Sequence, residues 1–295
     1  MDILTSASPI SRLQEPIYIS HRGEAADAPE GSLPAYQLAI ERQLPCIKLD
    51  VHYTRDKVII MSHDESLQRT TGWLGAIKEQ DYASLKENAI FNPVNEYSSE
   101  RIVTFAEALA VVKECPLFYL DFKNDFSLEI LEDVLAQCRD FGISRQRLIF
   151  PNFIADTLLS IKHAYPALRT LRHISYQRNE QGSYRLPWQD EEVASAALAG
   201  NIIKHARELE LFGVSLPAHP DKTGPELIAE LQANGLWVPV WFVNDDVLAK
   251  YFYHAGANAF VSDCGDRVRA VVRREISLLR ERKVMTLATK ISVNG

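Results

Sequence analysis

The chain has 295 residues, of which 46% are hydrophobic and 24% are charged, and this composition excludes a disordered or collagen-like polymer. With 32 basic and 39 acidic side chains the net charge is -7, which argues against a generic binder of nucleic acids or anionic membranes. The length suits either two domains or one α/β barrel.

Short apolar runs recur along the chain and are typical of strands that are buried on both faces. They cover residues 16–20, 46–51, 58–62, 117–122, 147–150, 168–173, 212–216, 237–243 and 259–262. Amphipathic segments between them predict helices over residues 33–43, 104–113, 127–141, 154–164, 191–209, 225–234 and 245–255. This alternation predicts an α/β protein, a (β/α)8 TIM-type barrel that forms a single domain over residues 1–295.

Local signals support the helix boundaries and mark two irregular segments. Ser32 is a candidate N-cap of the first helix, and Thr104 with Glu107 forms a capping-box pattern. The connection between residues 50 and 58 is too short for a crossover helix and indicates a hairpin-like excursion. Residues 66–103 are long and polar, so we expect a polar excursion after the third strand.

The absence of targeting signals predicts a cytoplasmic protein. No stretch of about 18 apolar residues could cross a membrane. The first residues, MDILTS, lack the basic start and the long apolar segment of a secretory signal. The cysteines are widely spaced, which is typical of reduced structural thiols; they are Cys46, Cys115, Cys138 and Cys264.

Polar residues cluster where the early strands end. The segments are Ser20-His21-Arg22-Gly23, Lys48-Leu49-Asp50, Ser62-His63-Asp64 and Leu120-Asp121-Phe122-Lys123. The carboxyl ends of parallel barrel strands form one mouth, where active sites lie. Alternate strand residues share a face, so Lys48 points the same way as Asp50, and Asp121 the same way as Lys123. Such a set suits an anionic substrate and acid–base chemistry.

Taken together, several motifs resemble the glycerophosphodiester phosphodiesterase family. They are His21-Arg22-Gly23, Pro29-Glu30-Gly31-Ser32, Lys48-Leu49-Asp50-Val51, His63-Asp64, Leu67-x-Arg69-Thr70-Thr71-Gly72, Leu120-Asp121-Phe122-Lys123, Trp241-Phe242-Val243-Asn244 and Val261-Ser262-Asp263. The resemblance runs from about Ile17 to Asp266, and its N-terminal block is the most specific part. It implies a TIM-type barrel that hydrolyses phosphodiesters, with His21 and His63 as acid and base.

The resemblance places Arg22 on the phosphate, and the charges and aromatic rings expected at the mouth add further candidates for substrate binding. Arg22, Lys48 and Lys123 would hold the phosphate, and Glu30 belongs to the same set. Trp241 would shape the pocket for the alcohol. The loop over residues 174–190 carries tyrosines, arginines and a tryptophan, so we expect it to overhang the mouth and contact a sugar or polyol phosphate.

The sequence departs from the family pattern at Gly31, where the family has an asparagine, and more consequentially at the metal ligands. The usual metal ligands of the family are a glutamate and an aspartate two residues apart on the second strand and a glutamate on the fourth. This sequence has Lys48, Asp50 and Asp121 there. We favour a site without a cofactor, in which Lys48 lies between the carboxylates and replaces the cation. The alternatives are Mg²⁺ or Ca²⁺ on Asp50 and Asp121 with Lys48 displaced, or loss of hydrolysis.

The sequence leaves three functions open. The first is cleavage of a small glycerol- or sugar-phosphodiester by the histidine pair. The second is a sugar-phosphodiester synthase or transferase of the agrocinopine type, because an acid–base pair works in both directions. The third is a non-catalytic binder of phosphate ligands. The expected partner is a small phosphodiester, without nucleic acid or an integral membrane segment, and no oligomeric state is predicted.

Overall fold

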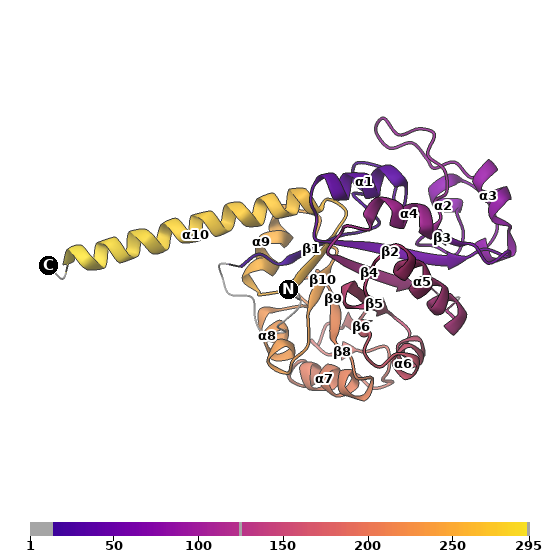
Figure 1. Cartoon of the computed structure of the whole chain (residues 1–295). Helices are drawn as coiled ribbons and strands as arrows, with labels where there is room; N and C mark the ends of the chain where they lie inside the picture. Colours follow the sequence, from indigo (N-terminus) through magenta and orange to yellow (C-terminus); the bar gives the residue numbers. More distant parts are fainter. Residues whose placement is uncertain (1–13, 124–125, 294–295) are drawn as a thin grey trace.

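Eight parallel strands form a closed barrel in the computed structural model, which describes residues 14–123 and 126–293 (Figure 1). The strands are β1 (Ile17–Ser20), β2 (Cys46–Tyr53), β4 (Leu117–Phe122), β5 (Leu148–Asn152), β6 (Arg169–His173), β9 (Gly213–Pro217), β10 (Pro239–Trp241) and β11 (Ala259–Ser262). Because β1 pairs with both β11 and β2, the sheet has no free edge within the barrel. The predicted TIM-type barrel is therefore confirmed.

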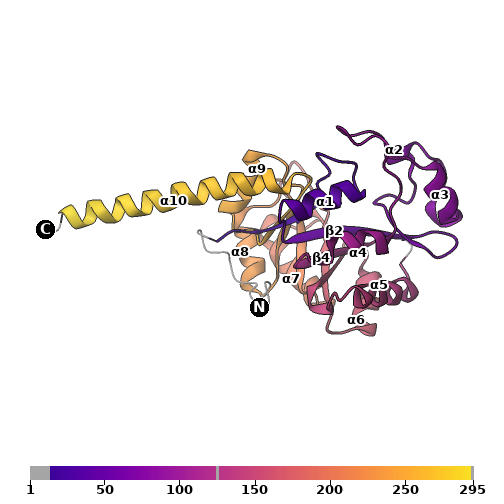
Figure 2. The same cartoon turned by 45° about the horizontal axis from the view of Figure 1, so that its top comes forward.

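Helices cover the outside of the barrel (Figures 1 and 2). They are α1 (Leu33–Glu41), α4 (Phe105–Val112), α5 (Leu128–Asp140), α6 (Ala155–Ala164), α7 (Leu198–Glu208), α8 (Pro225–Ala233), α9 (Asp246–His254) and α10 (Gly265–Val293). Ser32 caps α1 by accepting a hydrogen bond from the backbone N–H of Ala35. Thr104 and Glu107 form the predicted capping box at the start of α4.

The interior of the barrel below the mouth is apolar. Its buried residues are Ile19, Cys46, Leu117, Tyr119, Ile149, Leu171, Trp237, Ala259 and Val261. Because alternate residues of a strand share a face, Lys48 and Asp50 point inward above Cys46. Asp50 also lies opposite Asp121 in the register between β2 and β4. The polar groups of the mouth therefore rest on an apolar layer that excludes water from below.

The third predicted strand does not belong to the barrel. The strand β3 (Ile59–Met61) pairs antiparallel with the outer end of β2, so it is the returning arm of a hairpin. This hairpin brings Ser62 back to Asp50, whose carbonyl oxygen accepts a hydrogen bond from the Ser62 N–H at 3.1 Å. His63 thus reaches the mouth although its strand runs against its neighbour.

The polar excursion predicted for residues 66–103 is present and carries a small core of its own. It contains α2 (Gln68–Thr71), a 3-10 turn (Ile77–Glu79) and α3 (Tyr82–Asn88). Its buried residues are Ile60, Leu67, Ile77, Leu85, Ala89, Phe91 and Ile102. This core fixes α2 beside the barrel mouth.

The segment after β6 differs from its prediction. It forms a hairpin of β7 (Gln177–Arg178) and β8 (Tyr184–Arg185). The rings of Tyr176 and Tyr184 are buried, and Trp188 stacks on His205 with 3.9 Å between ring centroids. Because these rings pack onto the protein itself, the expectation that they contact the substrate is wrong.

The helix predicted over residues 191–209 is shorter than expected. The backbone of Val193 pairs with that of Tyr184, which keeps this stretch extended against the hairpin. A 3-10 turn follows over Ser195–Ala197, and α7 begins only at Leu198.

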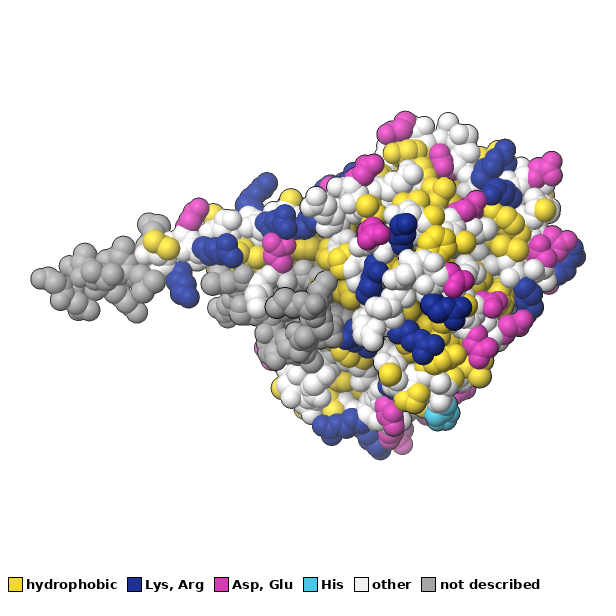
Figure 3. Space-filling model, in the orientation of Figure 1, with side chains coloured by type: hydrophobic (Ala, Val, Ile, Leu, Met, Phe, Trp, Pro, Cys, Tyr) yellow, Lys and Arg dark blue, Asp and Glu magenta, His cyan; other side chains and the backbone are white. Residues whose placement is uncertain are grey.

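The helix α10 projects well beyond the barrel (Figures 1 and 2). Its first turns pack against α9, β1 and β11, and they bury Val268, Val272 and Ile276. Further along, Leu278 and Val284 are exposed among arginine and lysine side chains (Figure 3). Among the described residues, none of the helices combines the length and the apolar character needed to span a membrane.

Candidate active site

A tight turn after β1 carries the first two candidate residues. Arg22 has a φ of 60°, which is rare for a residue with a side chain, and Gly23 follows with a φ of 80°. A Cβ atom at Gly23 would lie 2.5 Å from the backbone carbon of Ala35, so only glycine fits there. The strained backbone is the kind that accumulates at functional sites.

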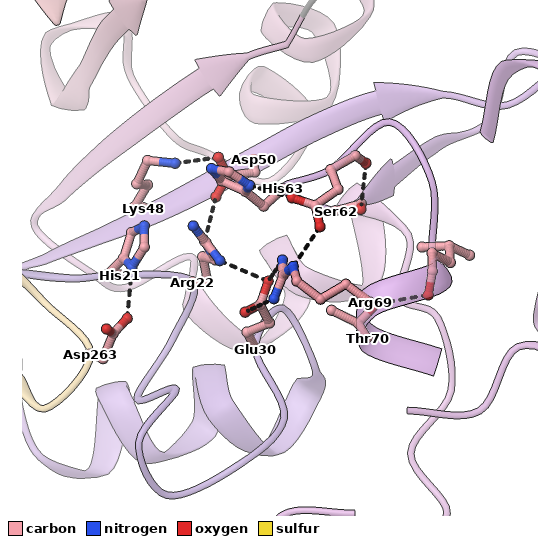
Figure 4. A network of polar contacts seen from close by, with 12 residues as sticks. His21, Arg22, Glu30, Lys48, Asp50, Ser62, His63, Arg69, Thr70 and Asp263 are labelled. Carbon is pink, nitrogen blue, oxygen red and sulfur yellow. Dashed lines mark hydrogen bonds and ion pairs between the residues drawn. The ribbon is translucent and has the colours of Figure 1, made fainter. Parts of the chain in front are cut away.

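The two predicted histidines face each other at the mouth (Figure 4). The ring centroids of His21 and His63 are 6.5 Å apart. His21 Nδ1 lies 2.7 Å from Asp263 Oδ1, and His63 Nδ1 lies 2.6 Å from Asp64 Oδ1. When each Nδ1 donates to its carboxylate, the opposite nitrogen Nε2 is left as a proton acceptor. The structure therefore brings the pair together; its catalytic role stays a prediction.

Both imidazoles are held in their neutral form at neutral pH. Burial lowers the pKa of His21 to about 4, although the hydrogen bond to Asp263 opposes this shift. Burial, followed by the positive charge of Lys123, also lowers the pKa of His63. A neutral imidazole can accept a proton, which is the first requirement for a general base.

Two lysines and two aspartates form a buried set of ion pairs, the Lys–Asp quartet. Lys48 Nζ contacts Asp50 and lies 2.9 Å from Asp121 Oδ2. Lys123 Nζ lies 2.6 Å from Asp50 Oδ1 and 2.6 Å from Asp121 Oδ2. Lys48 is therefore between the two carboxylates, and Lys123, which the sequence predicts only as a phosphate ligand, shares them.

The charges of the quartet stabilise one another. Burial alone would raise the pKa of Asp50, but Lys123 and Lys48 hold it well below its usual range. The same two lysines lower the pKa of Asp121 against the effect of burial. Burial would lower the pKa of Lys123, yet the two carboxylates raise it. For Lys48 burial prevails, and its pKa is lowered.

A divalent metal does not fit the quartet as it stands. Both candidate ligands, Asp50 and Asp121, are already occupied by ammonium groups, which would repel a cation. Within the described part of the chain, no three His, Cys, Asp or Glu side chains are arranged to hold a metal ion. The two ammonium groups therefore bring positive charge to the residues that the family resemblance assigns to Mg²⁺ or Ca²⁺; the replacement of the metal stays a prediction.

Arg22 supplies a further cation with spare hydrogen-bonding capacity. Its Nη1 donates to Glu30 Oε1 at 2.8 Å. Its Nε is buried without a hydrogen-bond partner, 3.9 Å from Asp50 Oδ2. Beside it lies a cavity of about 10 Å³, which Arg22, Glu30 and His63 help to line. This volume is enough for about one water molecule; the binding of phosphate by Arg22 stays a prediction.

Aromatic rings occupy the opposite side of the mouth. This aromatic wall consists of Phe153, His173, Trp241 and Phe242. Phe242 lies 4.6 Å from His21 between ring centroids, and Phe153 lies 4.8 Å from His173. Phe153 is 49% exposed and Phe242 is 41% exposed, so both present apolar surface at the mouth.

His173 and Trp241 contribute polar atoms to this wall. The Nδ1 of His173 and the indole Nε1 of Trp241 are buried without a hydrogen-bond partner. Burial lowers the pKa of His173 to about 3, so its ring is neutral. Its Nε2 lies 4.0 Å from Asp121 Oδ2, which connects the wall to the quartet.

Sequence reasoning missed His173 and Phe153. His173 ends a predicted strand, the same position that drew attention to the other mouth residues, so the signal was available. Phe153 follows β5 and has no polar signature. Asp64 and Asp263 belong to the motifs that resemble the family, but no separate role is predicted for them from the sequence.

Comparison with known proteins places this geometry in context. The model of the glycerophosphoryl diester phosphodiesterase family matches residues 21–267. A glycerophosphodiester phosphodiesterase of Caldanaerobacter subterraneus is 23% identical over 262 residues, which cover 88% of this chain and 98% of that relative.

Solved structures share the barrel. An Oleispira antarctica phosphodiesterase in complex with the product sn-glycerol-3-phosphate aligns with a TM-score of 0.69 and 23% identity, covering 88% of this chain and 97% of the other. A glycerophosphodiester phosphodiesterase from Agrobacterium tumefaciens aligns with a TM-score of 0.68 and 17% identity, covering 87% of this chain and 100% of the other.

Proposed function

The chain belongs to the glycerophosphoryl diester phosphodiesterase family, and from this premise we propose that it hydrolyses small glycerol or sugar phosphodiesters. The observation that carries the proposal is the pair of imidazoles, His21 and His63, 6.5 Å apart between ring centroids and each held by its own carboxylate. Such a pair can remove one proton and deliver another, which a site that only binds phosphate does not need.

The phosphate binds between the histidines and the cationic groups of the mouth. Arg22 offers its unpaired Nε, and Lys48 and Lys123 supply further positive charge close by. Positive groups fixed in advance around the non-bridging oxygens stabilise the charge of a phosphoryl transition state.

Cleavage then needs two proton transfers. One histidine takes a proton from the attacking oxygen, which is a water molecule or a neighbouring hydroxyl of the substrate. The new P–O bond forms as the bond to the leaving alcohol breaks. The other histidine, which first binds a proton from solvent at its Nε2, passes that proton to the alcohol oxygen. Attack by a substrate hydroxyl yields a cyclic phosphate first, which water then opens.

The Lys–Asp quartet supports a reaction that needs no metal. Its two ammonium groups lie where the family pattern has a cation, and the carboxylates Asp50 and Asp121 keep them charged and in place. An ammonium group stabilises the negative charge of a phosphate less than a divalent ion does, but no chelator can remove it.

The aromatic wall supports an alcohol that carries hydroxyl groups. The exposed faces of Phe153 and Phe242 can pack against the C–H groups of a sugar or polyol. His173 and Trp241 can meet its hydroxyl groups with their unpaired ring nitrogens. Pockets of this kind combine apolar surface with a few polar groups that fix orientation.

The test measures the cleavage of a panel of glycerol and sugar phosphodiesters by the wild type and by Lys48→Glu. Phosphorus NMR monitors each reaction in EDTA or with added Mg²⁺ or Ca²⁺. We expect the wild type to cleave at least one diester at the same rate in EDTA. Lys48→Glu restores three carboxylates, so its activity should require added metal. Lys57→Glu is the matched control, because Lys57 is exposed and pairs with Glu129 at the surface.

Three results would contradict parts of the proposal. Wild-type activity that disappears in EDTA and returns with metal would show that Lys48 moves aside for an ion. An inactive wild type with an active Lys48→Glu variant would mean that Lys48 prevents hydrolysis. Tight phosphate binding without cleavage by either protein would indicate a binding protein.

A further inference from the structure

Arg69 connects the two sides of the charged site through carboxylates (Figure 4). Its Nε donates to Asp64 Oδ2 at 2.6 Å, and its Nη1 and Nη2 donate to Glu30 at 2.9 and 2.7 Å. Asp64 also contacts Nδ1 of His63, and Glu30 also accepts a hydrogen bond from Arg22. One guanidinium therefore holds both the carboxylate behind a candidate acid–base group and the carboxylate behind a candidate phosphate ligand.

We propose that Arg69 is a positioning residue that fixes His63 and Arg22 in one geometry for phosphate binding and diester cleavage. This inference rests on the proposed function for its catalytic part. It also gives the excursion of residues 66–103 a role, because Leu67, directly before α2, is buried in the apolar core of the excursion and so anchors the helix that carries Arg69.

The bond pattern suits arginine and not lysine. A planar guanidinium can form parallel hydrogen bonds to one carboxylate while a third N–H reaches another, as Arg69 does with Glu30 and Asp64. A lysine ammonium is a point charge without this fork. Lysine should therefore keep the charge at this position but only part of the geometry.

The exposure of Arg69 argues against a role in folding alone. Its side chain is 50% exposed, and ion pairs at exposed positions contribute little to the free energy of unfolding. The contacts it makes, however, are all to residues that orient groups at the mouth. Its loss should thus change geometry at the site more than stability of the fold.

Removing Arg69 should affect both partners. Burial would raise the pKa of Glu30, but Arg69 and Arg22 lower it. Without Arg69, Glu30 would pair with Arg22 alone and compete more strongly with phosphate for that guanidinium. Asp64 would lose its anchor, so the contact that orients the ring of His63 would no longer be held in one geometry.

The pH profile provides a readout that a purely structural role would not change. The charged groups that act on His63 come from several elements: Asp64, Asp50, Lys48, Lys123 and Arg22. Arg69 adds a positive charge behind Asp64, so its removal should raise the pKa of His63. The limb of the rate profile that reports this histidine should then move to higher pH.

The experiment compares Arg69→Gln and Arg69→Lys with Arg55→Gln as the matched control. Arg55 makes a similar pair of hydrogen bonds to Asp81, is 62% exposed and lies outside the site. We expect kcat/KM of Arg69→Gln to fall on the order of 10²-fold, as for a misplaced catalytic group. Arg69→Lys should recover part of this loss, and Arg55→Gln should stay within about twofold of the wild type.

Two further measurements separate positioning from folding and from the proposed function. Arg69→Gln combined with Asp64→Asn should lose little more activity than Arg69→Gln alone, because Asp64 acts through His63, which the loss of Arg69 already disturbs. Calorimetric titration with inorganic phosphate should show a lower affinity for Arg69→Gln and not for Arg55→Gln, even if no diester is cleaved.

The inference is overturned if Arg69→Gln keeps both its kcat/KM and its phosphate affinity within about twofold of the wild type. It is also overturned if its loss of activity only follows its unfolded fraction. A wild type that cleaves no diester would contradict the proposed function, and the phosphate titration alone would then decide on the positioning of Arg22.

Discussion

The charged side of the mouth and the aromatic wall opposite differ in how completely their polar atoms are paired. On the charged side, the lysines, Arg22, Arg69 and the Asp64 carboxylate that holds His63 form a continuous network of contacts through Asp50, Asp121 and Glu30. In the wall, His173 Nδ1 and Trp241 Nε1 have no partner, and Phe153 and Phe242 remain partly exposed. Most groups of the charged side are thus paired before a ligand binds, although Arg22 Nε and Asp50 Oδ2 have no hydrogen-bond partner, whereas the ring nitrogens of the wall lack partners that an alcohol could supply.

This difference assigns the two parts of a diester to two regions. A phosphate is the same in every diester, so a preformed charged site can serve all of them. The alcohols vary, and an unsatisfied aromatic wall can discriminate among them by which hydroxyl groups they bring. The following predictions test that division, from the largest expected effect to the smallest.

Changing either candidate acid–base residue should have the largest effect. We expect His21→Ala and His63→Ala each to lower kcat by about 10²-fold or more on every diester, because proton transfer serves all alcohols alike. Steady-state kinetics on two diesters with different alcohols would measure this, with the exposed His254→Ala as control. Losses of kcat below threefold for both variants would refute the acid–base assignment. A loss limited to one alcohol would contradict the division of the mouth into a phosphate region and an alcohol region.

The free energy of unfolding should depend on pH because of two buried neutral histidines, His21 on the charged side and His173 in the aromatic wall. The folded pKa is about 4 for His21 and about 3 for His173, both below the unfolded value. As pH falls below about 6.5, the unfolded chain therefore binds protons that the folded chain does not, and stability declines. Urea unfolding at pH 7 and at pH 4.5 should show a decline smaller by about 2 kcal/mol in His173→Phe than in the wild type.

An equal decline in both proteins would mean that His173 is solvated or charged in the folded state. The comparison of two proteins matters because other groups titrate in this range. Burial raises the pKa of Glu24 to about 7, which favours the folded state as pH falls. Since that contribution is common to wild type and variant, it cancels in the difference.

Replacing His173 should also change selectivity, by a smaller amount. His173→Phe keeps an aromatic ring beside Phe153 but removes both nitrogens. We expect kcat/KM to fall about tenfold for a diester of glycerol and to stay nearly constant for a diester of propanol, the cost of about one hydrogen bond. Equal losses for both alcohols would instead show that His173 acts through Asp121 and the quartet.

The barrel was readable from the sequence because strands buried on both faces leave continuous apolar runs. The shared inward direction of Lys48 and Asp50 was also readable, because side chains alternate between the two faces of a strand. The hairpin that turns β3 back along β2 was also readable, because the connection between residues 50 and 58 is too short for a crossover helix. Burial of Tyr176 and Tyr184, in contrast, depends on tertiary packing, and it removes the substrate contacts expected of these two rings.

Two other features were missed for different reasons. The role of His173 depends on rings contributed by β5 and β10, which no local pattern connects. The chain after residue 264 has helix-forming residues, but they are rich in charge and their apolar residues only partly face the barrel. Packing against the barrel therefore accounts only for the first turns of α10. The alternation of strands and helices that predicts the barrel says nothing about the projecting part.

The two histidines follow strands whose positions can change independently of each other. His21 follows a barrel strand, whose position is fixed by β2 and β11 on either side. His63 follows β3, which pairs with β2 and bridges to Thr104 through Ile60, and the turn between β2 and β3 lies at residues 54–57. A residue inserted in that turn would shift His63 along the mouth while the barrel stayed the same. The spacing of the acid–base pair is thus open to evolutionary or designed adjustment through a surface turn, separately from the stability of the scaffold.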